Sequence, residues 1–91
     1  MPDHPVQATA PTSPVLTDYD RRHLKTYLRL LDAAADGADW REAAALVLGL
    51  DIAAGEDQAR ATHDSHLARA RWMTEHGYRD LLRGAPPPAS G

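Results

Sequence analysis

The sequence predicts an all-α domain of three to four helices, and the placement of proline and the composition between the prolines predict it. Four prolines lie before residue 15, three lie after residue 84 and none lies between. Because proline breaks helix interiors, helices can run only in the stretch between. Alanine, leucine and arginine dominate that stretch, which favours helix over strand. We expect one small domain at 16–84 and disordered Pro-rich tails at 1–15 and 85–91.

The first predicted helix begins with a capping box and ends at a glycine. Thr17 is followed three residues later by Asp20, so each side chain can bond the backbone N–H of the other. Gly37 is the expected end of this helix. Between them, an apolar stripe at helical spacing consists of Leu24, Leu28, Leu31 and Ala35, flanked by Tyr27 and Ala34. This stripe is the predicted buried face.

Two further helices are predicted after Gly37. Asp39 caps a short helix over 40–48, which faces inward through small and β-branched side chains and stops at Gly49. A linker over 50–55 leads to a third helix that runs to about residue 76. The inward stripe of the third helix consists of Ala59, His63, Leu67, Ala70 and Met73. A last helical turn is expected over 78–83.

Composition excludes several classes of protein. Thirteen acidic and ten basic residues leave a net charge of -3, so no overall attraction draws the chain to nucleic acid or anionic lipid. The absence of cysteine excludes disulfides, cysteine-based zinc sites and thiol catalysis. No apolar run approaches the ~20 residues that span a bilayer, and the N-terminus has no features of a signal peptide. These features predict a cytoplasmic protein without membrane contact.

The histidines do not form a recognisable metal or catalytic motif. His63 and His66 lie three residues apart on one helix, but a zinc site needs three or four ligands. Asp64, Ser65 and His66 include the residue types of a hydrolytic triad, yet consecutive helical residues point about 100 degrees apart and cannot align. We therefore expect no catalytic residues, no metal and no cofactor, and a protein that is not an enzyme.

The sequence argues against DNA binding, although three helices have the general outline of a helix-turn-helix. Arg69, Arg71, Arg79 and Arg83 make the C-terminal part locally basic. However, the third helix begins with Glu56 and Asp57, which would present carboxylates to phosphates. The linker before it is also longer than the usual turn of 3–4 residues.

Contact with a protein partner is the function that the aromatic residues favour. Trp40, Trp72 and Tyr78 are too large for so small a domain to bury completely, and Trp, Tyr and Arg are enriched at binding hot spots. Trp72 could equally cap the core against Tyr78 or Leu82. The predicted partner-binding residues are Arg69, Trp72, His76, Tyr78 and Arg79.

Several blocks of sequence resemble a proteobacterial family. The blocks are Tyr19–Leu24, Asp39–Ala44, Asp64–Met73 and Thr74–Leu82, within a resemblance over 16–84. The family is a helix-turn-helix variant with an extended turn. It supplies the DNA-binding halves of FseA-like and RovC-like transcriptional activators, and it also stands alone in QseM-like antiactivators encoded on integrative and conjugative elements.

The acidic start of the third helix and the short N-terminal tail favour the QseM-like branch. The resemblance then implies an antiactivator that binds a transcriptional activator and blocks activation of conjugative-element transfer genes. The partner would be an FseA-like activator, with a quorum-sensing activator as one option; the oligomeric state stays open. The alternative function is a DNA-binding helix-turn-helix transcriptional regulator.

Overall fold

Helices form all the regular structure of residues 6–77, the part of the chain that the computed structural model describes. In chain order they are α1 (Asp18–Arg22), α2 (Leu24–Ala35), α3 (Trp40–Leu46), the 3-10 helix η1 (Ile52–Ala54), α4 (Glu56–Trp72) and the π-helical turn η2 (Met73–Gly77). The predicted all-α class is therefore confirmed.

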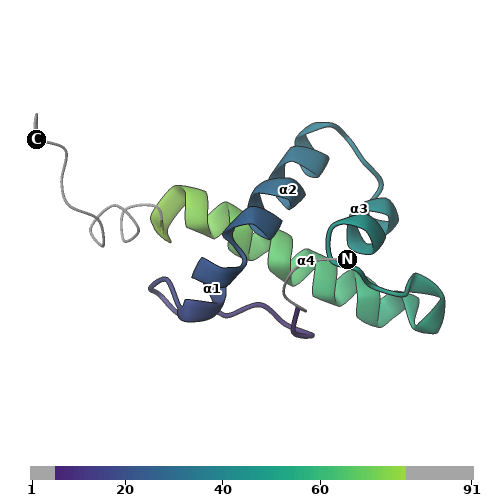
Figure 1. Ribbon diagram of the computed structural model, residues 1–91, viewed down its shortest axis with the longest axis horizontal. Coiled ribbons are helices and arrows are strands. Elements are labelled where there is room, and N and C mark those ends of the chain that lie inside the picture. The colour runs from purple at the N-terminus through teal and green to yellow at the C-terminus, as the bar shows by residue number, and fades with distance from the viewer. Residues whose placement is uncertain (1–5, 78–91) are drawn as a thin grey trace, which may run out of the picture.

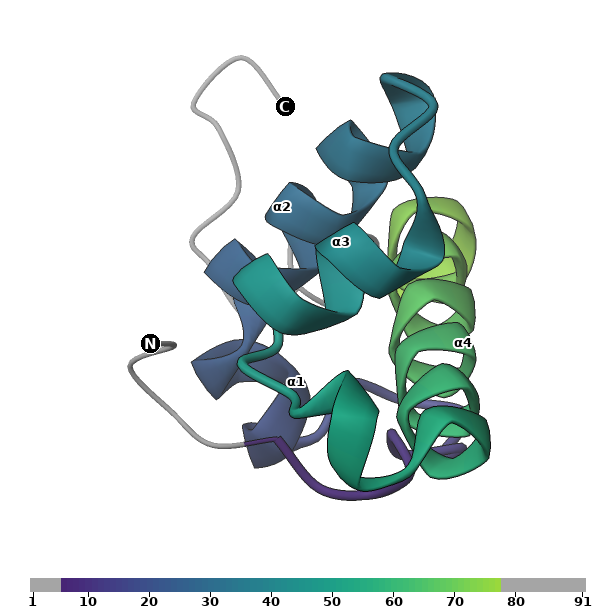
Figure 2. The same ribbon diagram turned by 90° about the vertical axis from the view of Figure 1, so that its right-hand side faces the viewer.

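The longest helix, α4, is the element on which the others pack. Both α2 and α3 contact α4 and each other, and α2 crosses α4 at a steep angle (Figure 1). Turned by 90 degrees, the molecule shows α4 along its right-hand edge and α2 passing obliquely from the left towards the upper right (Figure 2). One face of α4 therefore meets the core and the opposite face is left to solvent. No helix in the described range is long and apolar enough to cross a membrane.

The predicted first helix is broken at one residue. The capping box of Thr17 and Asp20 is present, but the backbone of His23 leaves helical geometry at φ -108 and ψ 15. The non-helical backbone at His23 is stabilised because Nδ1 of His23 donates a hydrogen bond to the carbonyl of Tyr19 at 2.8 Å. The chain therefore forms α1 and α2 in place of one helix.

The buried face of α2 also differs from the predicted stripe. Tyr27 and Leu30 are the buried residues of α2. Leu24 and Leu31 only flank the core, and Leu28 keeps 54% of its surface exposed. The predicted stripe is thus one edge of the helix rather than its centre.

The predicted signals around α3 are confirmed. Gly37 and Gly49 have φ values of +75 and +69, the left-handed region in which glycine is the least strained residue. The side chain of Asp39 accepts a hydrogen bond from the backbone N–H of Arg41. Ala43 and Ala44 are buried, as their inward register predicts.

Two buried clusters hold the helices together. One joins the N-terminal side of the domain to the C-terminal half of α4 and consists of Leu16, Tyr27, Ala70 and Met73. The other joins α2 to α3 and to the chain that follows α3, and consists of Leu30, Ala43 and Leu48. Each side chain removed from water contributes about 1.5–3 kcal/mol when it is large and fully buried.

Residues 6–15 pack on the domain, whereas the sequence places them in a disordered tail. Ala10 is only 5% exposed, and its N–H donates to Oγ of Ser65 on α4 at 3.1 Å. The N–H of Gln7 donates to the hydroxyl of Tyr19 at 2.9 Å. This extended segment needs no helix of its own because side chains of α1 and α4 bond its backbone groups. The predicted helical turn at 78–83 and tail at 85–91 lie outside the described residues.

Candidate functional site

The solvent face of α4 is the longest continuous helical surface that the core leaves uncovered. α4 has 17 residues, a length of about 25 Å. Its exposed face, opposite the buried residues, carries Asp57, Arg60, Ala61, Asp64, Ala68 and Arg71. The side chains of the two alanines are short, so another molecule can approach the helix backbone closely in the middle of this face. We call these residues the α4 solvent face.

The charges of this face are mixed and largely available. Arg60 lies 3.7 Å from the carboxylate of Asp64, one turn away, and such exposed pairs are weak, typically below about 1 kcal/mol. Arg71 makes no ion pair with any residue in the range 6–77. Both arginines can therefore turn to an anion at little cost.

A cluster of one aromatic and two basic side chains, Trp40, Arg41 and Arg60, connects the start of α3 to the α4 solvent face. The guanidinium of Arg41 lies 5.0 Å from the ring centroid of Trp40, and that of Arg60 lies 5.5 Å from it. Arg41 also forms an ion pair with Glu56, the first residue of α4. The negative charge of Glu56 is therefore balanced inside the protein, which the sequence alone does not reveal.

A buried ion pair fixes the position of α4 relative to α1 and α2. Arg69 donates to both carboxylate oxygens of Asp20, from Nε at 3.0 Å and from Nη2 at 2.6 Å. The hydroxyl of Tyr27 donates to the same carboxylate at 2.8 Å. Burial opposes ionisation of Asp20, but hydrogen bonds from Arg69, from Thr17 and from Tyr27 outweigh it and hold its pKa below the usual value.

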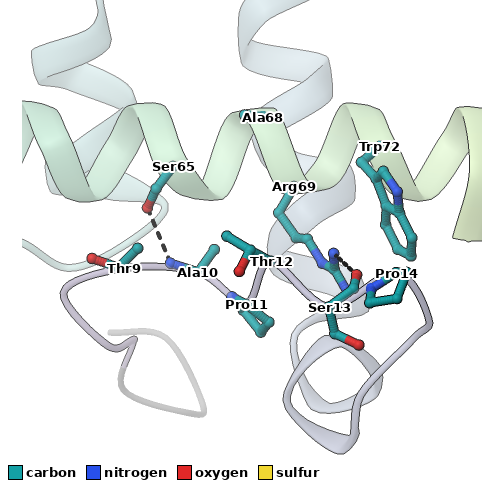
Figure 3. Close-up of a pocket in the computed structure, with 10 residues that line it drawn as sticks. All are labelled: Thr9, Ala10, Pro11, Thr12, Ser13, Pro14, Ser65, Ala68, Arg69 and Trp72. Carbon is teal, nitrogen blue, oxygen red and sulfur yellow. Dashed lines mark hydrogen bonds between the residues drawn. The ribbon is translucent and has the colours of Figure 1, made fainter.

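The same arginine holds the N-terminal segment. Arg69 donates to the carbonyl of Ser13 at 2.7 Å and to that of Val15 at 3.0 Å. Between this segment and α4 lies an open groove of about 520 Å³ (Figure 3). The groove is lined by Thr9, Ala10, Pro11, Thr12, Ser13, Pro14, Ser65, Ala68, Arg69 and Trp72. All three nitrogens of the Arg69 guanidinium donate to groups of the protein itself, and the surface of the groove is mostly apolar.

His66 is a structural residue and belongs to no metal cluster. Its Nδ1 donates to the carbonyl of Thr62 at 2.7 Å, so Nε2 accepts from the hydroxyl of Tyr19 at 2.6 Å. Burial lowers the pKa of His66, assisted by the charges of His23 and His63 and opposed by the bond to Thr62. Residues 6–77 contain no group of three or more His, Asp or Glu side chains that could hold a metal ion.

Three of the predicted partner-binding residues form a stack along the end of α4 and into η2. The guanidinium of Arg69 lies 3.8 Å from the ring centroid of Trp72. The ring of His76 stacks on Trp72 at 6.3 Å with an interplanar angle of 17 degrees. Arg69 is buried, Trp72 is half-buried against the core and His76 is exposed. Tyr78 and Arg79 lie outside the described residues.

These positions limit what the stack can offer a partner. The guanidinium of Arg69 is used within the protein, so only the outer edge of Trp72 and the ring of His76 are open to another molecule. The assignment of this set as a contact surface stays a prediction. Sequence reasoning missed the cluster of Arg41 and Arg60 around Trp40, because the aromatic–arginine contact joins residues on different helices.

Comparison with known families identifies the domain. Residues 4–83 match the family model RovC_DNA-bd, described as "T6SS, Transcription factor, DNA binding domain". No curated protein matches the chain. Because the match covers most of the 91 residues, the chain belongs to this family of DNA-binding domains. The family match begins before the packed N-terminal segment, and so includes it.

The family match overturns the expectation that DNA binding is unlikely. That expectation rested on the net charge of the chain and on the carboxylates of Glu56 and Asp57. Net charge is a property of the whole chain and does not describe one face, and Glu56 is paired with Arg41. The match supports transcription regulation and a helix-turn-helix-like DNA-binding domain. The match does not support the more specific predictions of a QseM-like antiactivator, of a role in conjugation or of a role in quorum sensing.

Proposed function

Since the chain belongs to the RovC family of DNA-binding domains, we propose that it is a sequence-specific DNA-binding regulator of transcription that reads DNA through the α4 solvent face. The family match over 4–83 is the observation that carries this proposal. α3, the connection that contains η1, and α4 supply the two helices and the extended turn of a helix-turn-helix variant.

The shape of α4 supports its role as the helix that enters the major groove. An α-helix fits that groove, and α4 exposes about 25 Å of its length on the side away from α2. Ala61 and Ala68 allow close approach to the bases. Asp64 lies between them and can accept a hydrogen bond from the amino group of cytosine.

Two arginines supply the phosphate contacts. Arg60 and Arg71 lie on the α4 solvent face, whereas Arg41, beside its N-terminal end, is engaged by Glu56. Each phosphate neutralised on B-DNA contributes about -0.9 to the slope of log K against log salt. Two contacts therefore predict a slope of about -2. The net charge of -3 adds no further attraction, so non-specific binding should be weak.

The experiment begins with selection of duplexes from a random pool by the full chain, followed by fluorescence anisotropy of the selected duplex at several salt concentrations. Arg71→Ala should weaken binding and reduce the magnitude of the slope by about one. Arg21→Ala is the matched control, because Arg21 is an exposed arginine on α1 that pairs with Asp18 and lies off the α4 solvent face. It should leave both quantities unchanged.

Two outcomes would overturn the proposal. If the pool yields no enriched duplex at low salt, DNA binding is rejected and binding to a protein partner becomes the favoured function. Equal losses in the Arg71 and Arg21 variants would retain DNA binding but reject α4 as the helix that reads it.

A further inference from the structure

The outward face of α2 carries a regular pattern of exposed charges. Lys25, Arg29, Asp32 and Asp36 follow one another at intervals of four, three and four residues, and all four are exposed. At 100 degrees per residue this spacing places them within an arc of about 60 degrees. None of them forms an ion pair with any residue between 6 and 77.

The order of these charges is unfavourable for α2 by itself. A helix is stabilised by acidic residues near its N-terminus and by basic residues near its C-terminus. α2 has the reverse order: Lys25 and Arg29 lie in its first half, whereas Asp32 and Asp36 lie at its end. No residue of the first turn of α2 is acidic and none of the last turn is basic. The pattern is therefore not explained by the stability of the isolated helix.

The same order is complementary to itself when the helix is reversed. Lys25 and Asp36 are equally distant from the middle of the pattern, and so are Arg29 and Asp32. A two-fold axis through that middle places the basic half of one helix against the acidic half of the other. It also compensates the dipole of each helix with the charges of its neighbour.

We propose that this face of α2 binds a second copy of the chain, with the two α2 helices antiparallel and related by two-fold symmetry. Lys25 then pairs with Asp36 of the second copy, and Arg29 with its Asp32, and each pair occurs twice. This proposal rests on the charge pattern of α2 and is independent of the proposed function.

Leu28 gives the interface an apolar edge. Its side chain is 54% exposed and lies beside the charged arc. The two-fold rotation brings both copies of Leu28 to the same edge, displaced along the helix axis by about 7.5 Å, a separation that two leucine side chains can bridge. An otherwise unexplained exposed leucine is thus covered in the dimer.

The association leaves the α4 solvent face uncovered. The charged arc of α2 lies opposite its buried residues Tyr27 and Leu30, and the α4 solvent face likewise lies opposite the buried residues of α4. A dimer formed through α2 therefore carries two α4 solvent faces, both accessible.

The test is sedimentation equilibrium of the full chain and of charge-reversed variants. The mass of the native chain should rise from 9.9 kDa towards twice that value with concentration, and added salt should reverse the rise. Lys25→Glu with Arg29→Glu should weaken self-association by about tenfold or more, and so should Asp32→Lys with Asp36→Lys. An equimolar mixture of these two double variants should form a heterodimer, because one face is wholly acidic and the other wholly basic.

A quadruple variant, with both reversals in one chain, supplies the matched control. It keeps the net charge of the native chain and restores complementarity, so it should dimerise again. Circular dichroism shows whether each variant keeps its helices. The proposal is overturned by a native chain that stays at 9.9 kDa at all concentrations, or by a dimer that neither double variant weakens.

Discussion

Removal of the buried carboxylate of Asp20 is the perturbation whose cost follows most directly from the structure. Asp20 is fully buried, and Arg69 opposite it is 5% exposed. Asp20→Ala leaves the guanidinium of Arg69 without its counter-ion and leaves the hydroxyl of Tyr27 and the N–H of Thr17 without their acceptor.

The expected cost is large compared with the stability of a small domain. Breaking a buried ion pair by removing one partner costs about 3–5 kcal/mol. A domain of this size has a free energy of unfolding of about 5–10 kcal/mol. The variant should therefore retain little stability, and its Tm should fall by about 12 °C or more, at about 4 °C or more per kcal/mol.

The assay is urea denaturation followed by circular dichroism, with two comparison variants. The double variant Asp20→Ala with Arg69→Met should be about 1–2 kcal/mol more stable than Asp20→Ala alone, because it no longer buries an unpaired charge. Asp18→Asn, at an exposed carboxylate 3.7 Å from Arg21, should change stability by less than about 0.5 kcal/mol. A loss below about 1 kcal/mol in Asp20→Ala, or no recovery in the double variant, would refute the reasoning.

Four further outcomes are expected. The pKa of His66 is lowered in the folded chain, so below about pH 6.5 the folded state binds fewer protons than the unfolded state, and the free energy of unfolding falls as the pH is lowered. His66→Gln should make the free energy of unfolding, measured by urea denaturation, fall less steeply between about pH 7 and 5. An unchanged dependence on pH would contradict this expectation. Gly37→Ala should cost about 1 kcal/mol in thermal melts, since φ is +75 and the surrounding space is open; a neutral change would show that the turn adapts. Ser65→Ala should cost about 1 kcal/mol and speed hydrogen exchange at the amide of Ala10, whose N–H it accepts; unchanged exchange there would mean that this bond does not hold the N-terminal segment. Trp72→Ala should cost about 2–3 kcal/mol because the ring is half-buried against the core; a cost near zero would place the ring outside the core.

Local signals in the sequence predict the helix ends well. The capping residues Thr17 and Asp39 and the glycines at 37 and 49 act within a few residues of their own positions, so spacing alone reveals them. The break at His23 is not predictable in the same way. It depends on a side chain that bonds the carbonyl four residues earlier, and no helix-breaking residue marks it.

The contacts between distant residues could not be predicted. Arg69 and Asp20 are 49 positions apart, and nothing in the sequence of either helix identifies the other as its partner. The sequence therefore predicts that Arg69 contacts a partner protein, whereas in the structure it bonds Asp20 of α1 and the carbonyls of Ser13 and Val15. Prolines likewise indicated a disordered segment at 1–15, although extended backbone can be bonded by neighbouring side chains, as at Ala10.

The error about DNA had a related cause. Arg41 on α3 pairs with Glu56, so that of the two acidic residues at the start of α4 only Asp57 makes no ion pair within residues 6–77. Charge on a face depends on which residues meet in space, and that information appears only in the fold.

The most direct test of the central claim, that α4 reads DNA through its solvent face, is an NMR titration of the full chain with the selected duplex. The amide resonances of Ala61, Asp64 and Ala68 should show the largest changes, and those of Lys25 and Arg29 on α2 should change little. Changes concentrated on α2, with the α4 resonances unmoved, would contradict the account.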